Sequence, residues 1–306
     1  MNALDKLKEA KGILSNAGIE NPERDAEVLL SHCLGIERVI LYRDDPDISD
    51  EMNAQTDALL KRRTGREPLQ YILGYTEFYG LKIKVGTGVL IPRPETELLA
   101  EEAIKTISKC KIQIANNLQS AGKDKVSSFI LHPSSFFILD LCTGSGCIAL
   151  ALAKAFPDAC VYGTDMSADA LIYAKENAGL NNIINITFLK GDLFKPVKDM
   201  QFDMIISNPP YIRKDDMKLL QPEIIDWEPV AALDGGEDGL DYYRKIISGA
   251  GDYLKENGTL LIEIGMGQSD PIRKMAEDEG FADIHVLKDY AGIERIIFLG
   301  GSRFAT

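Results

Sequence analysis

Residues 136–156, FFILDLCTGSGCIALALAKAF, decide the fold of this chain. The apolar run at 136–142 predicts a buried strand, and the apolar residues over about 146–156 predict a helix. The glycines between them let the backbone turn sharply and approach a ligand, while the helix that follows offers N–H groups and its positive dipole end to an anion. A strand, a glycine loop and a helix in this order predict the first unit of a parallel α/β sheet.

The alternation of strand and helix continues beyond this unit. Further strands are predicted at 160–165, 185–190, 202–207, 258–265, 282–288 and 294–299, and further helices at about 167–180, 239–256 and 268–280. Such regular alternation predicts a parallel sheet with right-handed crossovers. Only the segment from Asp289 to Ile293 joins the last two strands, which is too short for a helical crossover, so we expect that pair to be antiparallel.

The N-terminal part of the chain predicts a small helical bundle over residues 1–75. Apolar residues recur at helical spacing before Gly18, Asn21-Pro22-Glu23 opens a second helix that ends near Gly35, and Ser49-Asp50-Glu51 opens a third that runs to Arg63. Residues 61–63 and Arg66 form a basic cluster, which predicts either a solvated helix face or a contact surface for an acidic partner.

Residues 76–94 predict a hairpin or short extended pair. Residues 78–85 alternate at period 2, and Gly86 and Gly88 mark a turn. A helix is predicted from Glu95 to about Lys109. Residues 110–135 are polar and carry paired asparagines and serines, so we interpret them as a surface loop or loosely ordered insertion.

Composition limits the classes of function. The chain has 306 residues and a net charge of −13, and residues 1–75 hold 10 basic and 14 acidic residues, so neither part is a basic domain. This argues against tight binding of a nucleic-acid duplex through its phosphates and favours a small-molecule or protein substrate. Hydrophobic residues make up 45% of the chain, but no apolar stretch is long enough to span a membrane and the N-terminus lacks a secretory apolar region.

The positions of the cysteines and histidines predict no metal site. The five cysteines are scattered, which predicts reduced thiols in a cytoplasm. The three histidines are far apart in the sequence, and no Cys/His spacing is typical of a zinc site.

Asn208-Pro209-Pro210-Tyr211 follows the strand predicted at 202–207 and has the residue types needed to grip a planar amino group. Two prolines in series supply no N–H donors, so the strand cannot continue its ladder. The Asn208 oxygen and the Pro209 carbonyl can each accept one amino hydrogen, and the Tyr211 ring can pack on the flat group. Acceptors placed out of the amide plane favour a pyramidal nitrogen whose lone pair is aimed at an electrophile. The stretch predicts catalysis at an amino or amide nitrogen; a plain proline-rich turn is the alternative.

Acidic residues follow the neighbouring strands. Asp165 ends the second strand, 21 residues after Gly144, a separation at which a carboxylate binds ribose hydroxyls in dinucleotide folds. Asp192 follows the third strand, where it either accepts from an adenine amino group or is a solvated turn residue. With Asp140 and Asn208 they fall on one rim, because ligands sit at the carboxyl ends of parallel strands. We therefore expect a ligand with an adenosine and a carboxylate or phosphate.

Together these motifs resemble class I S-adenosylmethionine-dependent methyltransferases that act on amino groups. Residues 67–74 (EPLQYILG), 77–81 (EFYGL) and 90–97 (LIPRPETE) narrow the resemblance. With the helical N-terminal region, they are similar to the HemK/PrmC family, the peptide-chain release factor glutamine N5-methyltransferases, over nearly the whole chain.

The resemblance implies an α/β fold with a seven-stranded, mostly parallel sheet whose last strand is antiparallel. It implies three parts: a five-helix bundle at 1–75 for substrate recognition, a hairpin linker at 76–94, and a methyltransferase domain at 95–306. The cofactor would be S-adenosyl-L-methionine, and the partners class 1 peptide-chain release factors in the cytoplasm, methylated on the glutamine of their Gly-Gly-Gln motif.

The resemblance also implies roles for individual residues. Around the methionine end of the cofactor it places Cys142, Thr143, Gly144, Ser145 and Gly146, and it places Asp165 at the ribose and Asp192 with Leu193 beside the adenine. Asn208 would touch the cofactor and, with Pro209, hold the glutamine amide, while Pro210 and Tyr211 complete the substrate pocket and Phe78 and the Pro92–Glu97 segment form its opposite wall. Cys142 stands where the family usually has glycine, and we expect the turn to survive with a negative φ at that residue.

Three other functions fit parts of the sequence. A nucleic-acid methyltransferase acting on adenine N6 or guanine N2 would use Asn-Pro-Pro-Tyr equally well, but the acidic charge and the lack of a basic recognition domain count against it. A catalytically silent binding protein would not need an intact amide-gripping motif. A nicotinamide oxidoreductase would need the full Gly-x-Gly-x-x-Gly fingerprint, and the chain has one Gly-x-Gly.

Overall fold

The computed structural model describes residues 1–120 and 136–301, with only the backbone described for residues 113–120. Contacts divide the chain into two compact units. Unit 1 comprises residues 1–76, 85–87 and 220–228, and unit 2 comprises residues 77–84, 88–219 and 229–306. Within the described ranges, no helix combines the length and apolar character needed to cross a bilayer.

Residues 1–75 form the helical bundle that the sequence predicts. Its five helices are α1 (Ala3–Asn16), α2 (Pro22–Leu34), α3 (Arg38–Asp44), α4 (Asp50–Thr64) and α5 (Leu69–Leu73). The Ser49 hydroxyl caps α4 by accepting from the N–H of Met52 at 3.2 Å, and Gly35 ends α2 in the left-handed conformation. Asn21 precedes α2 at the cap position, but its side chain makes no capping hydrogen bond. Apolar residues of these helices, including Leu7, Leu14 and Leu29, form one buried core.

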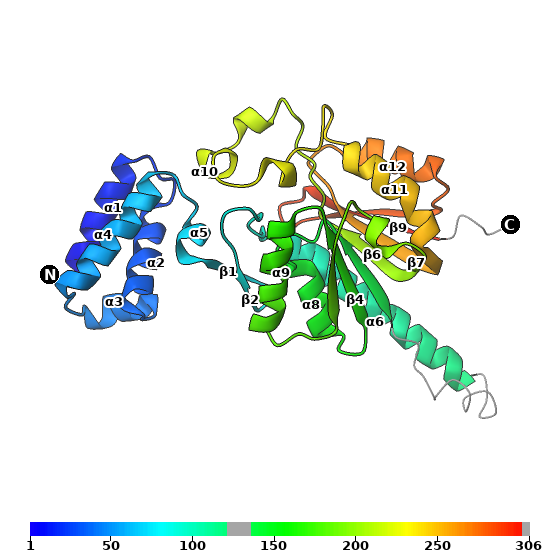
Figure 1. Ribbon diagram of the computed structural model, residues 1–306, viewed down its shortest axis with the longest axis horizontal. Helices are drawn as coiled ribbons and strands as arrows, with labels where there is room; N and C mark the ends of the chain where they lie inside the picture. The colour runs from blue at the N-terminus through cyan, green and yellow to red at the C-terminus, as the bar shows by residue number, and fades with distance from the viewer. Residues whose placement is uncertain (121–135, 302–306) are drawn as a thin grey trace. The chain divides into compact units, whose positions relative to one another are not determined.

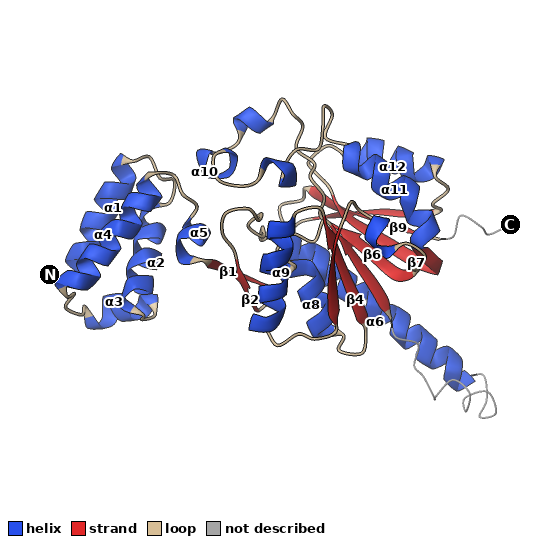
Figure 2. Cartoon of the chain, viewed as in Figure 1, coloured by secondary structure: helices blue, strands red, loops and turns tan. Residues whose placement is uncertain are grey.

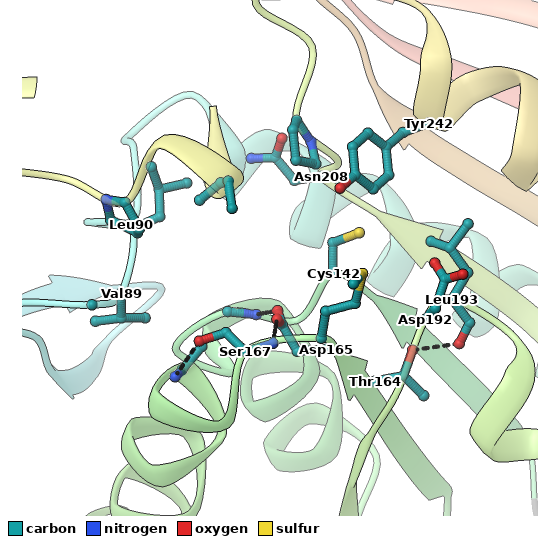
Figure 3. Close-up of a pocket in the computed structure, with 18 of the residues that line it drawn as sticks. Val89, Leu90, Cys142, Thr164, Asp165, Ser167, Asp192, Leu193, Asn208 and Tyr242 are labelled. Carbon is teal, nitrogen blue, oxygen red and sulfur yellow. Dashed lines mark hydrogen bonds between the residues drawn. The ribbon is translucent and has the colours of Figure 1, made fainter. Parts of the chain in front are cut away.

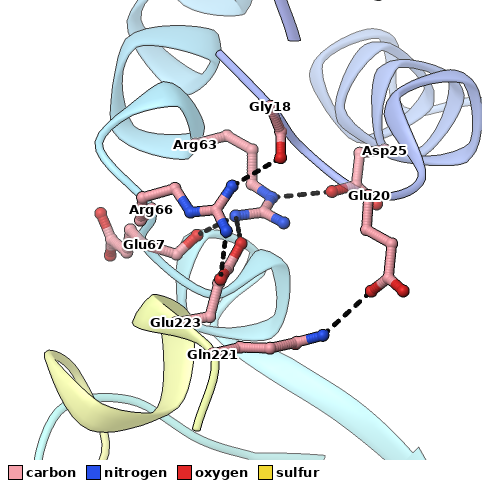
Figure 4. A network of polar contacts seen from close by, with 8 residues as sticks. All are labelled: Gly18, Glu20, Asp25, Arg63, Arg66, Glu67, Gln221 and Glu223. Carbon is pink, nitrogen blue, oxygen red and sulfur yellow. Dashed lines mark hydrogen bonds and ion pairs between the residues drawn. The ribbon is translucent and has the colours of Figure 1, made fainter. Parts of the chain in front are cut away.

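A second segment, far along the chain, completes unit 1 (Figure 4). Helix α10 (Pro222–Ile225) lies in residues 220–228, and its Glu223 pairs with Arg63 at 3.0 Å and with Arg66 at 3.1 Å. Arg63 also donates to Asp25 at 2.7 Å and is 7% exposed. Both sequence interpretations of the basic cluster are therefore wrong for Arg63, because it is buried and its charge is satisfied inside unit 1 by acidic side chains, whereas Lys61 and Arg62 are exposed as a solvated helix face requires.

Unit 2 is built on a seven-stranded sheet in the order β5-β4-β3-β6-β7-β9-β8, which lies between two layers of helices (Figures 1 and 2). The strands are β3 (Phe137–Leu141), β4 (Cys160–Asp165), β5 (Ile186–Lys190), β6 (Phe202–Ser207), β7 (Leu254–Glu263), β8 (Asp283–Lys288) and β9 (Glu294–Gly300). Strands β3 to β7 pair in parallel, whereas β9 runs antiparallel to both β7 and β8. The predicted parallel sheet with an antiparallel last strand is confirmed.

Helices cover both faces of this sheet. On one face lie α6 (Thr96–Ser120), α8 (Cys147–Ala155) and α9 (Ala168–Leu180), and on the other lie α11 (Asp241–Tyr253) and α12 (Ser269–Asp278). The strand order runs one way from β3 to β5 and the other way from β6 to β7. The order therefore reverses between β3 and β6, where ligands bind in open α/β sheets.

Three local predictions are wrong. The hairpin of β1 (Tyr75–Phe78) and β2 (Leu81–Lys84) turns at Tyr79-Gly80, both with positive φ, so the assumed alternation through residues 78–85 is broken, although a turn also lies at 87–88 as predicted. A loop was expected over residues 110–135, but helix α6 continues to Ser120, because lysine, glutamine, alanine and leucine favour a helix. Residues 121–135 lie outside the described part of the chain. Strand β7 begins at Leu254, which pairs with Phe202 before a register shift.

Candidate active site

A pocket opens at the carboxyl ends of the strands in unit 2, at the point where the strand order reverses (Figure 3). Residues that directly follow or end four neighbouring strands line it: Cys142 and Gly144 after β3, Thr164 to Ser167 at the end of β4, Gly191 to Leu193 after β5, and Asn208 with Pro210 after β6. The rim predicted from the sequence is therefore confirmed for Asp165, Asp192 and Asn208. Asp140 does not reach it, because its side chain is fully buried within β3.

The glycine loop after β3 turns through three residues with positive φ. Gly144 has φ +54° and Gly146 has φ +80°, and Cys142 has φ +57°. The expected negative φ at Cys142 is wrong, since the turn keeps the left-handed conformation that glycine would adopt freely. A Cβ atom at Gly146 would lie 3.0 Å from the Phe188 ring, so a side chain here would have to push that ring aside.

Asp140 at the end of β3 stabilises the glycine loop through a hydrogen bond. The Thr143 hydroxyl donates to the Asp140 carboxyl at 2.6 Å. Burial raises the pKa of Asp140 to about 7, more than the hydrogen bond from Thr143 lowers it. Asp140 therefore supports the loop and does not meet a ligand.

Asp165 is held by two backbone donors and faces the pocket. Its Oδ2 accepts from the N–H of Gly144 at 2.9 Å, and its Oδ1 accepts from the N–H of Ser167 at 2.8 Å. Burial raises the pKa of Asp165, while these hydrogen bonds act in the opposite direction. Each carboxylate oxygen has a further lone pair, so the group can accept two more hydrogen bonds, as a pair of vicinal hydroxyls requires.

The segment after β5 forms the adjacent wall. Asp192 lines the pocket and pairs with Lys195 at 2.8 Å, so its carboxylate has a partner on its own turn. The Leu193 carbonyl accepts from the buried Thr164 hydroxyl at 3.0 Å, which fixes this segment to the end of β4. The wall therefore offers an acidic group beside the apolar side chain of Leu193.

In the Asn-Pro-Pro-Tyr segment, Asn208 and Pro210 line the pocket, whereas Pro209 and Tyr211 do not. The Asn208 Nδ2 donates to the Thr96 hydroxyl at 3.1 Å. The Tyr211 hydroxyl donates to Glu263 at 3.4 Å, and its carbonyl accepts from Gln268 at 2.9 Å. Burial, followed by the charge of Glu263, raises the pKa of Tyr211. Tyr211 therefore holds the segment in place through these hydrogen bonds.

Some predicted site residues lie outside the pocket. Thr143, Ser145 and Gly146 belong to the glycine loop but are buried and do not line the pocket. Phe78 is 1% exposed and does not line the pocket either. Their proposed roles at the ligand stay predictions.

Sequence reasoning missed several lining residues. Tyr242 on α11 points its ring toward the space beside Asn208 and Cys142 (Figure 3). Residues 88–90 line another part of the pocket, as do Pro229, Ala231 and Ala232. Met166, 61% exposed, could have been found as the residue after Asp165, but nothing in the local sequence marks Tyr242. Within the described ranges, no cluster of His, Cys, Asp or Glu side chains fits a metal ion.

Comparisons with known proteins place this geometry in a family. Residues 5–74 match the family described as the PrmC N-terminal domain, and residues 121–228 match the methyltransferase small domain. A release factor glutamine methyltransferase of Thermodesulfovibrio yellowstonii is 44% identical over 303 residues, covering 99% of each chain. One of Geobacter sulfurreducens is 41% identical, covering 94% of this chain and 92% of that protein.

Among solved structures, a methyltransferase from Pyrococcus furiosus matches with a TM-score of 0.50 and 18% identity, covering 82% of this chain and 98% of that one, which shows the fold. The sheet order, the helix layers and the matched methyltransferase domain are those of a class I methyltransferase. Since relatives more than 40% identical match over nearly its full length, the chain belongs to the HemK/PrmC family of release factor glutamine methyltransferases.

Proposed function

We propose that the protein transfers a methyl group from S-adenosylmethionine to the side-chain amide nitrogen of the glutamine in the Gly-Gly-Gln motif of class 1 release factors. The observation that carries this proposal is the position of Asn208, which lines the pocket next to the glycine loop and has its amide nitrogen bonded to Thr96. The full-length relatives bear the name of this activity. Release factors act with ribosomes, so the proposal includes a cytoplasmic location.

The pocket suits the methyl donor. Asp165 supplies a carboxylate with unused acceptor capacity for the ribose hydroxyls. Leu193 and Met166 offer apolar contacts to an adenine ring, and Asp192 lies where it can accept from the adenine amino group. Cys142 and Gly144 of the glycine loop line the pocket, where their backbone can meet the methionine end. When bound, the donor supplies a methyl group carried on a positively charged sulfonium. After the transfer, the rest of the donor is a neutral thioether and leaves.

On the substrate side, the residues act by positioning. An amide nitrogen is a poor nucleophile, because its lone pair is delocalised. The Asn208 oxygen and the Pro209 carbonyl can each accept one hydrogen of the glutamine –NH2 and favour a pyramidal nitrogen. Pro210 and the Tyr242 ring restrict the flat group from the sides. The nitrogen–carbon bond forms as the carbon–sulfur bond breaks, and the nitrogen then loses one proton to solvent.

A methyl-transfer assay tests the proposal. Isotopically labelled S-adenosylmethionine is offered with a purified class 1 release factor, with its Gln→Ala variant, or with total RNA or DNA. Label on the release factor that disappears in the Gln→Ala variant identifies both substrate and acceptor atom. Label on nucleic acid instead would show that Asn208 grips a base, and the proposed substrate would be withdrawn.

A further inference from the structure

Asn177 on α9 bonds to two segments that are far apart in the sequence. Its Oδ1 accepts from the Lys84 N–H at 2.7 Å, and its Nδ2 donates to the Lys84 carbonyl at 3.1 Å. The same Nδ2 donates to the Ser145 carbonyl in the glycine loop at 3.0 Å. Asn177 is 0% exposed and Ser145 is 2% exposed, so water does not compete for the bond to the loop. One amide therefore joins the end of strand β2 to the glycine loop.

The hairpin meets α9 along the open edge of β2. Within the described residues, β1 and β2 form a sheet of two strands, so one edge of β2 needs other partners. Alternate residues of a strand present their backbone groups at the same edge, and Lys82 and Lys84 meet α9 there. Asn181, one turn after Asn177, donates to the Lys82 carbonyl at 2.9 Å. Both asparagines therefore hold the hairpin by its backbone, and Asn177 adds the bond to the glycine loop.

The partners of Asn177 determine which side chain this position accepts. Two carbonyls need donors and one N–H needs an acceptor. An amide supplies both kinds of group from one flat side chain. A carboxylate would set its oxygens against two carbonyl oxygens, and an aliphatic side chain would remove the partner of all three backbone groups.

Both segments that Asn177 joins lead into the pocket. Ser145 follows Gly144, which lines the pocket and bonds to Asp165. Residues 88–90, which come shortly after Lys84, line another part of it. Gly88 packs against the same helix α9, since a Cβ atom there would lie 3.3 Å from the Cβ atom of Asp169. Helix α9 thus supports two walls of the pocket from outside it.

We propose that Asn177 is a positioning residue for the methyl donor, which holds the glycine loop against the hairpin and keeps its backbone ready for the methionine end. The inference rests on the proposed function, because S-adenosylmethionine is the ligand of the loop there. Asn177 does not line the pocket and acts through Ser145. A loop that is already ordered loses less conformational entropy on binding, so the loss of this bond lowers cofactor affinity and leaves the transfer step unchanged.

The matched pair Asn177→Leu and Asn181→Leu tests the inference. Leucine is close to asparagine in shape and makes no hydrogen bond. Both variants lose bonds to the hairpin, and of the two only Asn177→Leu loses the bond to the glycine loop. In calorimetry with S-adenosylmethionine, we expect the Kd to rise roughly 10- to 100-fold in Asn177→Leu, the effect of an unsatisfied hydrogen-bonding group, and by less than about 2-fold in Asn181→Leu. The kcat at saturating cofactor should stay close to wild type in both, and thermal unfolding checks that both are folded.

Several outcomes would overturn the assignment. An unchanged Kd in Asn177→Leu would do so, as would equal losses of affinity in the two variants, which would place the effect in the hairpin. Where Asn177→Leu fails to fold, Asn177→Ser replaces it. One hydroxyl cannot serve three backbone groups, so the Kd should still rise, and an unchanged Kd there would count against the inference. A wild-type protein that binds S-adenosylmethionine but methylates no release factor contradicts the proposed substrate instead.

Discussion

The loop after β3 and the loop after β6 lie on the same edge of the sheet, yet they are held in different ways. The glycine loop is fixed mainly by residues closer in the sequence: Thr143 bonds to Asp140 three residues before it, and Gly144 bonds to Asp165 on the adjacent strand. The Asn-Pro-Pro-Tyr segment is fixed by side chains 112, 52 and 57 residues away, those of Thr96, Glu263 and Gln268.

The difference follows from what each loop presents. A loop that binds with its backbone needs its own φ and ψ angles to be right, and glycine with hydrogen bonds to nearby elements achieves this. A loop that acts through one amide side chain must also hold that side chain in place, and here side chains from other elements of the fold do this. Both loops nevertheless rest on a buried carboxyl, Asp140 in one and Glu263 in the other.

The largest expected effect is that of Asn208→Ala, which tests whether the loop after β6 serves methyl transfer while the loop after β3 serves cofactor binding. Asn208→Ala removes the proposed acceptor for the amide hydrogens, so we expect kcat to fall about 10²- to 10³-fold, the usual cost of losing one group that stabilises a transition state. Cofactor affinity, measured by calorimetry, should be nearly unchanged. If it fell in parallel with kcat, the division of labour between the loops would be wrong.

Asp165→Ala should give the opposite pattern and serves as the control for the previous variant. The loss of charge-assisted hydrogen bonds should weaken cofactor binding roughly 10- to 100-fold. The kcat at saturating cofactor should change much less. Calorimetry together with steady-state kinetics would show this, and an unchanged cofactor Kd would remove Asp165 from the site.

The buried carboxyls under the two loops predict how stability changes with pH. The pKa values of Asp140 and Glu263 are both raised to about 7, from ordinary values of 3.8 and 4.5. The folded state therefore binds these protons more tightly than the unfolded chain does. Their contribution to the free energy of unfolding is complete below their ordinary pKa values, falls as the pH rises through about 7, and is level above.

Urea unfolding at several values between pH 5 and 8 measures this slope. Asp140→Asn and Glu263→Gln should each remove one of the two contributions. An identical slope in the wild type and in both variants would mean that neither carboxyl carries its proton into the folded state.

The smallest expected effect concerns Cys142 in the glycine loop. Its φ of +57° costs a residue with a side chain about 1 kcal/mol, which glycine would avoid. The freedom that glycine adds to the unfolded chain offsets roughly 0.5–1 kcal/mol of this gain. We expect Cys142→Gly to be as stable as the wild type or slightly more so in thermal unfolding, and Cys142→Ala to be no more stable than the wild type. A marked loss with glycine would mean that the thiol itself holds the loop.

Most of the fold could be predicted from the sequence. Strands β4 and β6 lie at the predicted residues, and the other strands of the seven-stranded sheet overlap their predictions, because buried parallel strands are short apolar runs bounded by polar turns. The polar end of α6 was missed, since polar sequences occur both in helices and in loops.

The candidate site was predicted in part. Asp165, Asp192 and Asn208 were found because each directly follows or ends a strand, and that position alone brings a residue to the edge of a parallel sheet. Tyr242 was missed because it lies on a helix whose own pattern does not reveal which side faces the pocket. Tyr211 was assigned to the pocket by its neighbours in sequence, whereas the chain turns its ring toward the core around Glu263.

The sequence by itself determined the β–α order, the place of the glycine loop and the residues at the strand ends, because these depend on local periodicity and on the backbone preferences of glycine and proline. Only the tertiary structure decided that Thr96 bonds to Asn208 and Glu263 to Tyr211, and that residues 220–228 belong with the N-terminal helices. Such contacts join residues far apart along the chain, and their hydrogen bonds and ion pairs exist only once the packed core has brought the elements together.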